Sequence, residues 1–181
     1  MRLWVDIETY SETDLVKHGV YPYTEDPRFT VILMAYALDD GPVQCWSYEM
    51  GPFHLLDAFD DPKMEVWAHN AEFERVCIKA KWSREANWRC SAVLAHSLGL
   101  PPRLADLARV LGVPGKLDSG KKLLEKFAFG HKKGRPNYKD PDWAEFKAYC
   151  MQDVEAARAC TKIMEQAPRD RTEVETRSSA E

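Results

Sequence analysis

The chain has 181 residues, of which 45% are hydrophobic and 30% charged, a length typical of one domain that needs no disulfide to hold its core together. Its 25 Lys and Arg residues against 29 Asp and Glu residues give a formal net charge of -4, which argues against a uniformly basic surface. The longest apolar run, Val31 to Leu38, is shorter than the ~20 helical residues that cross a bilayer. Asp6 and Glu8 also interrupt the place where a secretory signal needs its apolar stretch. We therefore expect a soluble, cytoplasmic protein without a membrane partner.

The cysteines form no Cys-x-x-C pair; they are Cys45, Cys77, Cys90, Cys150 and Cys160. An odd number without such pairs argues against a zinc site and against a disulfide framework. We expect buried, reduced thiols that pack as small apolar residues. A cysteine nucleophile paired with His69 or His96 is the alternative, although no local motif favours it.

The first half of the chain predicts an antiparallel meander. Leu3, Val5 and Ile7 alternate with Trp4, Asp6 and Glu8, as in a strand, and a loop rich in Thr, Tyr, Asp and Pro follows. The sequence Asp39-Asp40-Gly41 is a turn signal between two further strands. The predicted elements are strands over 3–8, 30–38 and 43–48, then a short amphipathic helix over 53–59 and a strand over 64–68.

Helical periodicity dominates the second half. The predicted elements are a helix over 71–81 capped by Asn70, a segment over 88–98 that begins as a strand and becomes helical, helices over 104–111 and 119–129, and a long helix that starts at Asp140-Pro141 and ends near 166. A meander followed by βα units predicts an α/β fold, with a mixed sheet and helices on its faces. The polar, aperiodic residues 167–181 are expected to be a disordered tail after a domain of residues 1–166.

Two carboxylates stand two positions apart on the first predicted strand. Because strand side chains alternate, Asp6 and Glu8 point to the same face. Two acids on one face repel each other and lose hydration, and a bound cation is the usual compensation. Such a pair also arises often by chance at a solvated sheet edge, so the spacing alone does not decide between the two.

Two later segments place further polar groups on helices. Asn70, Phe73 and Glu74 open a helix directly after a strand, where α/β proteins often carry functional groups. Tyr149 and Asp153 lie four apart and share one helix face. Taken singly, each segment also fits an ordinary helix with a cap, a packed aromatic ring and a solvated acid.

Together, these three segments resemble the exonuclease motifs of the DEDD (DnaQ-like) 3′–5′ exonuclease superfamily, in its tyrosine-bearing branch. The segments are Asp6-Ile7-Glu8-Thr9, His69 to Glu74 and Tyr149 to Asp153, and the likeness covers residues 1–166. The intervening segments resemble the proofreading exonuclease domain of bacteriophage family A DNA polymerases; they are Trp88-Arg89-Cys90-Ser91, Leu98-Gly99-Leu100-Pro101, residues 104–111 and residues 116–124 with Gly120.

The resemblance implies a ribonuclease H-like fold with a mixed five-stranded sheet and hydrolysis assisted by two divalent metal ions, Mg²⁺ or Mn²⁺. It also implies a role for each residue: Asp6 bridges both ions, Glu8 and Asp153 hold the ion that activates water, Tyr149 orients that water, Glu74 acts through the second ion, Asn70 and Phe73 support the site, and Thr9 lies beside the terminal nucleotide. The chain departs from the family at one position, because Glu74 stands where the family usually has Asp.

A basic segment precedes the third motif. Between Lys116 and Lys139 it holds eight Lys or Arg residues, among them Lys132, Lys133 and Arg135, with Phe127, Phe129 and Tyr138 interspersed. In an otherwise acidic chain, this composition favours a patch that guides a nucleic-acid strand through phosphate contacts and stacking. The alternative is a solvated helix face with a flexible loop.

The leading hypothesis is a two-metal 3′–5′ exonuclease that releases 5′-mononucleotides from single-stranded DNA ends, for proofreading or end processing. Two ions ~3.5–4 Å apart can activate water and neutralise the leaving oxygen, and a set of oxygen ligands favours Mg²⁺ or Mn²⁺. Two alternatives are an exoribonuclease of the same fold and a non-catalytic module that binds DNA ends or a DNA polymerase. A phage origin would place the protein in the host cytoplasm, as a free-standing enzyme or as part of a polymerase.

Overall fold

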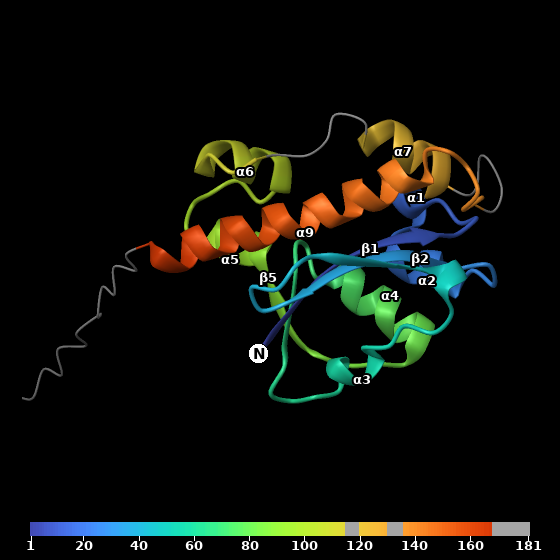
Figure 1. The fold of residues 1–181 in the computed structure, drawn as a ribbon, viewed down its shortest axis with the longest axis horizontal. Helices are drawn as coiled ribbons and strands as arrows, with labels where there is room; N and C mark the ends of the chain where they lie inside the picture. The colour runs from blue at the N-terminus through green and yellow to red at the C-terminus, as the bar shows by residue number, and fades with distance from the viewer. Residues whose placement is uncertain (115–119, 130–135, 168–181) are drawn as a thin grey trace, which may run out of the picture.

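The computed structural model of the chain describes residues 1–114, 120–129 and 136–167. Its centre is a five-stranded sheet in the order β3-β2-β1-β4-β5 (Figure 1). The strands are β1 (Arg2–Tyr10), β2 (Thr30–Leu38), β3 (Gln44–Ser47), β4 (Glu65–Ala68) and β5 (Asn87–Cys90). The pairs β1–β2 and β2–β3 are antiparallel, whereas β1–β4 and β4–β5 are parallel. This arrangement confirms the predicted meander followed by βα units.

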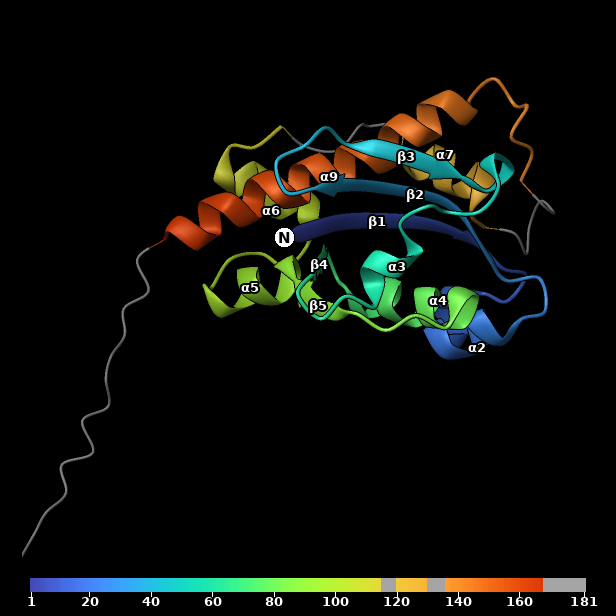
Figure 2. The same cartoon turned by 60° about the horizontal axis from the view of Figure 1, so that its bottom comes forward.

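Helices cover both faces of the sheet. Figures 1 and 2 show α6, α7 and α9 on one face and α2, α3 and α4 on the other. The helices are α1 (Leu15–His18), α2 (Val20–Glu25), the 3₁₀ turn η1 (Tyr48–Met50), α3 (Leu56–Phe59), α4 (Glu72–Trp82), α5 (Ser91–Ser97), α6 (Leu104–Leu111), α7 (Gly120–Phe127) and α9 (Trp143–Gln166). Of the helices in these described ranges, none has the length and apolar character that crossing a bilayer requires.

Alternate side chains of the central strands β1 and β2 point to the two helical layers. In β1, Trp4 and Tyr10 pack in the cluster that contains α7 and α9, whereas Leu3, Val5 and Ile7 pack toward α4. The β1–β2 register shifts after Glu8, which leaves one extra residue in β2, a β-bulge. Because both faces are covered, nearly every side chain of β2 is buried, as the continuous apolar run predicts.

Strand β1 extends well past its parallel neighbour. Strand β4 pairs only with Arg2, Leu3 and Trp4 of β1. The rest of β1, which carries Asp6 and Glu8, continues beyond this pairing, and α4 begins four residues after β4 ends. Beyond this pairing, β4 leaves one edge of β1 uncovered. At this edge α4, which packs on one face of the sheet, can approach Asp6 and Glu8, which point to the other face.

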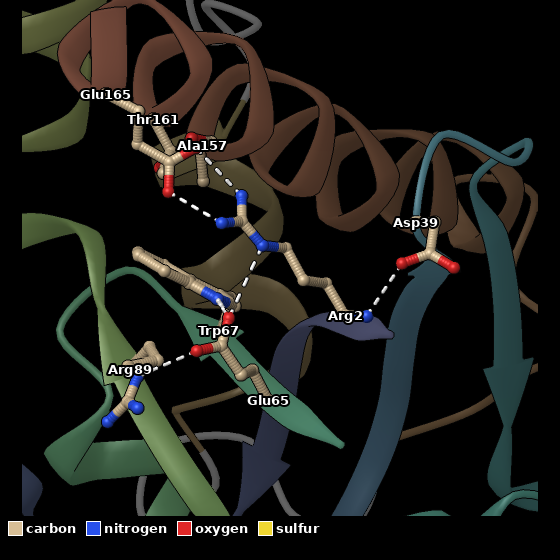
Figure 3. A network of polar contacts seen from close by, with 8 residues as sticks. All are labelled: Arg2, Asp39, Glu65, Trp67, Arg89, Ala157, Thr161 and Glu165. Carbon is tan, nitrogen blue, oxygen red and sulfur yellow. Dashed lines mark hydrogen bonds and ion pairs between the residues drawn. The ribbon is translucent and has the colours of Figure 1, made fainter. Parts of the chain in front are cut away.

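Charged side chains hold the start of β1 against the end of α9 (Figure 3). The Arg2 guanidinium donates to both carboxylate oxygens of Glu165 at 2.8 Å, and its Nε lies 3.4 Å from Glu65. Glu65 also accepts from Arg89 on β5, and the Asp39 carboxylate accepts from the Arg2 backbone N–H. A bidentate pair of this kind fixes direction as well as distance, so this network ties the end of α9 to the start of β1.

Two helices lie where the sequence predicts only a loop. Helix α1 is capped by the Asp14 side chain, which accepts from the backbone N–H groups of the next turn, and α2 buries Tyr23. Gly19, with φ of 79°, separates the two helices. Each has fewer than two turns, which is too short to show a hydrophobic period. The predicted loop over this segment is therefore wrong.

Three predicted helix starts also need correction. Asn70 is not the cap of α4, because it has a left-handed φ of 66° and Ala71 occupies the cap position; Asn tolerates this conformation better than most residues. Helix α3 covers only the second half of the predicted 53–59, since Phe53 packs edge-on against Tyr36 and Trp46. Residues Asp140 and Pro141 form a turn before α9 rather than its first turn.

All five cysteines are free, as predicted, but their burial differs. Cys77, Cys150 and Cys160 are buried, whereas Cys45 and Cys90 are only partly buried, so the expectation of five fully buried thiols is wrong for these two. The His69 ring nitrogens contact the Ser91 hydroxyl at 2.9 Å and the Pro102 carbonyl at 2.8 Å, and neither of these partners is a cysteine.

Candidate active site

Asp6 and Glu8 lie on the α9 side of β1, in the alternation with Trp4 and Tyr10. Carboxylate oxygens of the two acids lie with the Cys150 sulfur in a group whose atoms are all within 4.8 Å of one another. The Cys150 thiol donates to Asp6 Oδ2 at 3.4 Å. The prediction that both acids share a face is therefore confirmed, and Glu8 is buried with 8% of its surface exposed.

Glu74 reaches the cluster from the opposite helical layer. It lies in the first turn of α4 and is only 4% exposed, and its Oε2 atom has no hydrogen-bond partner in the described part of the chain. Burial raises the pKa of Glu74 well above its usual range, and the negative charge of Asp6 raises it further. A buried carboxylate with an unsatisfied oxygen beside a second acid is a fitting environment for a cation.

Helix α9 contributes Asp153 and Tyr149, both buried, at 6% and 3% exposure. The two residues lie one turn apart, and the Tyr149 ring is stacked on Phe146 with 6.4 Å between ring centroids. Asp153 and Asp6 line the same cavity of about 480 Å³, together with His69 and Arg103. The structure therefore brings the third predicted motif to the first one across the α9–β1 interface.

A second cavity of about 450 Å³ opens beside the other two acids. Glu8 and Glu74 line it, and so do three of the predicted substrate-binding residues, Thr9, Asn70 and Phe73. Asn70 lines both cavities, and the four acids are divided between their walls. The wall of this second cavity also includes apolar side chains of α1 and α7, so it combines carboxylates with a surface on which a base can pack.

A tyrosine that the sequence interpretation missed supports this cavity. The Tyr23 hydroxyl lies 2.8 Å from Thr9 Oγ1, and its ring centroid is 6.3 Å from that of Phe73. Burial is the main reason that the pKa of Tyr23 is raised, so its hydroxyl stays protonated. No sequence signal points to Tyr23, because it comes from a helix of fewer than two turns. Cys150, by contrast, could have been found, since it stands three residues before Asp153 on one helix face.

The basic segment is only partly described. Lys132, Lys133 and Arg135 lie outside the described residues, so their predicted contact with a nucleic-acid strand stays a prediction. Within the described part, Lys126 pairs with the carboxylates of Asp140 and Asp142. Its charge therefore holds α7 to the turn before α9, and it serves packing rather than an open phosphate site.

The acid cluster suits hard divalent ions by its chemistry. Asp6 and Glu8 lie together with one thiol beside them. Glu74 lines the same cavity as Glu8, and Asp153 lines the same cavity as Asp6. Oxygen ligands of this kind prefer Mg²⁺ or Mn²⁺. The unsatisfied Oε2 of Glu74 is the observation that most directly calls for a positive partner. The residues Asp6, Glu8, Glu74 and Asp153 are therefore the groups that could hold metal here.

Replacing Glu74 by Gln is expected to stabilise the protein in the presence of a chelator. The amide keeps the shape but cannot ionise, so it avoids the desolvation cost of a buried carboxylate and should raise Tm by several degrees. Because the pKa of Glu74 is raised on folding, the wild-type protein loses stability as the pH rises above about 4.5, so the gain should grow toward neutral pH.

Thermal unfolding at pH 5 and pH 8, with chelator or with Mn²⁺, measures this effect. The wild-type protein should be stabilised more by Mn²⁺ than the Gln variant. Gln in place of the exposed Glu72, on the same helical turn, provides the control and should show neither change. Equal Tm values for the wild-type protein and Glu74→Gln at pH 8 in chelator would contradict the interpretation.

Comparison with known proteins relates the chain by sequence to one protein and by fold to several others. No family model matches the chain. It is 42% identical over 173 residues to a DNA polymerase of Bacillus phage SP02, a match that includes 87% of this chain and 27% of that protein, so the chain spans about a quarter of its relative. Among solved structures, Brucella melitensis NrnC matches with a TM-score of 0.56 at 14% identity, over 91% of this chain and 72% of that one.

The ribonuclease D of Escherichia coli also has this fold. It matches with a TM-score of 0.54 at 14% identity, over 91% of this chain and 40% of that one. These two structural matches concern the fold, and the polymerase match concerns the sequence itself. Together with the three motifs, they bear out the resemblance to the DEDD (DnaQ-like) exonucleases: the chain is homologous to part of a phage DNA polymerase and has the fold of these two nucleases.

Proposed function

We propose that the chain is a metal-dependent 3′–5′ exonuclease that removes 5′-mononucleotides from single-stranded DNA. The observation that carries this proposal is the meeting of Asp6, Glu8, Glu74 and Asp153, from one strand and two helices, at the walls of two cavities. Burying acids together is costly unless cations compensate them, and an ordinary structural role does not call for that cost.

The four acids would hold two divalent ions, Mg²⁺ or Mn²⁺, in this proposal. Such ions, when bound, supply an activated water and neutralise charge on the scissile phosphate. The Tyr149 hydroxyl would orient the attacking water. Among the neighbouring solved structures, one of Brucella melitensis NrnC contains bound Mg²⁺, which supports divalent metal as the cofactor class.

The second cavity would receive the terminal nucleotide. Its volume of about 450 Å³ lies in the range of pockets for small ligands. Phe73 would pack against the base, and Thr9 would contact the sugar from a position fixed by Tyr23. Asn70 would support the wall that both cavities share. Lys132, Lys133 and Arg135 would guide the preceding strand through phosphate contacts.

The homology to a DNA polymerase favours DNA as the substrate and a polymerase as the partner or the remainder of the protein. The second candidate is a 3′–5′ exoribonuclease, because E. coli ribonuclease D is an exoribonuclease and a structure of NrnC is bound to pGG. The two candidates differ in how the cavity accommodates a 2′-hydroxyl. A third, non-catalytic module for DNA ends would use the same surface without hydrolysis.

Digestion of labelled single-stranded DNA and RNA oligonucleotides of equal sequence separates these candidates. A 5′ label should yield a descending ladder and a 3′ label an immediate mononucleotide, with Mg²⁺ or Mn²⁺ but not with excess chelator. A 3′-terminal phosphate should block the reaction, whereas a 5′ block should not. Faster digestion of RNA would favour the second candidate, and binding without digestion at any metal concentration would favour the third.

A further inference from the structure

A glycine on α7 lies directly against the ring of Tyr149. A Cβ atom built at Gly120 would be 3.0 Å from both Cδ2 and Cζ of Tyr149, and closer still to Cε2. Real Cβ atoms essentially never lie within 3.0 Å of another group. The backbone and the ring are therefore in contact in a way that only a residue without a side chain permits.

The backbone conformation does not explain this glycine. Four glycines of the described chain have a left-handed φ, namely Gly19, Gly51, Gly99 and Gly112, and Gly120 is not among them. It is the first residue that the structure describes in α7, and a helical position does not itself require glycine. The close approach to Tyr149 is thus the physical reason for glycine at this position.

Neither partner can move away easily. The Tyr149 ring is 3% exposed and is stacked on Phe146, which is itself stacked on Phe127 with ring centroids 5.1 Å apart. Helix α7 is fixed by the buried side chains of Leu123 and Phe127 and, at its far end, by the ion pairs of Lys126. An added methyl group must therefore displace the ring, and its rigid plane carries the hydroxyl along.

We propose that Gly120 is a positioning residue for Tyr149: its missing side chain sets where the ring, and with it the phenol hydroxyl, lies one helical turn from Asp153. This inference rests on the proposed function, in which that hydroxyl orients water. A displacement of roughly 1 Å in a reacting group can cost on the order of 10²-fold in rate. Gly120 itself touches no reacting atom, so it acts through Tyr149 alone.

The test is a double-mutant cycle between Gly120→Ala and changes at Tyr149. Gly120→Ala should lower kcat by about 10–100-fold while KM for the oligonucleotide and the Mn²⁺ midpoint stay within about 2-fold. In a Tyr149→Phe background, which has no hydroxyl to displace, the same substitution should change kcat by less than about 2-fold. Glu125→Ala, at an exposed position of α7, is the matched control and should leave kcat unchanged.

Thermal unfolding tests the contact without reference to activity. Gly120→Ala should lower Tm by several degrees in the wild-type background but not in Tyr149→Ala, where no ring is left to clash. A wild-type kcat in Gly120→Ala, an equal loss in both tyrosine backgrounds, or a Tm loss that persists in Tyr149→Ala would overturn the proposal. An inactive wild-type protein would contradict the proposed function instead, and the thermal cycle would still decide whether Gly120 positions Tyr149.

Discussion

Replacing Asp6 by Asn should reduce hydrolysis of single-stranded DNA by at least about 10³-fold, the upper end of what a single electrostatic group contributes. Asp6 is the acid that connects the others. Its carboxylate lies beside the Glu8 carboxylate and the Cys150 thiol, and its charge raises the pKa of Glu74. It also lines the same cavity as Asp153. The amide preserves the shape and volume of the side chain but removes the charge that would hold metal.

The variant should remain folded, because one of several mutually repelling acids has been neutralised. Its Tm in chelator should equal or exceed that of the wild-type protein, and the stabilisation by Mn²⁺ should be reduced. Glu145→Gln, an exposed acid in the first turn of α9, is the matched control and should retain full activity. Wild-type turnover in Asp6→Asn, measured with 5′-labelled DNA and Mg²⁺, would refute the metal-dependent mechanism.

The second large effect is expected for Tyr149→Phe. Removal of the hydroxyl keeps the stacking on Phe146 and the contact with Gly120, so the packing of α9 should not change. Groups that take part in proton transfer or orient a reacting water contribute ~10²–10⁴-fold, and kcat should fall within this range. Because Tyr149 is not proposed as a metal ligand, the Mn²⁺-induced increase in Tm should be retained.

A Phe substitution at Tyr138, an exposed tyrosine that precedes the same helix, is the control for loss of a hydroxyl alone. Single-turnover measurements with saturating Mg²⁺ separate turnover from binding. If Tyr149→Phe kept the wild-type kcat, Tyr149 would be a packing residue and another group would orient the water. If instead the loss appeared only in KM, the hydroxyl would contribute to substrate binding rather than to the chemical step.

The sequence predicts the parts of the site that depend on spacing within one element. The period of a strand places Asp6 and Glu8 on one face, and the period of a helix places Tyr149 and Asp153 one turn apart. The order and type of the strands also follow from alternation and turn signals, because these patterns are local. The family resemblance then brings the separate segments into one site.

The environment of Glu74 cannot be predicted in this way. Its burial depends on how α4 docks below the sheet while Asp6 faces the layer above, and a local pattern contains no such information. The same holds for Tyr23 and Gly120, whose importance comes from contacts with Thr9 and Tyr149 across the fold. For Asn70, by contrast, a local signal exists but misleads. The sequence predicts a helix cap, whereas the turn before α4 places Asn70 in a left-handed conformation.

The uncovered edge of β1 has a consequence for how the protein matures. Strand β4 leaves most of β1 without a parallel partner, and the acids of the cluster come from both sides of this gap: Asp153 with α9 and Glu74 with α4. A folding intermediate in which only one helical layer has docked therefore contains three of the four acids at most. The proposed site would therefore be complete only when both α4 and α9 have docked on the sheet.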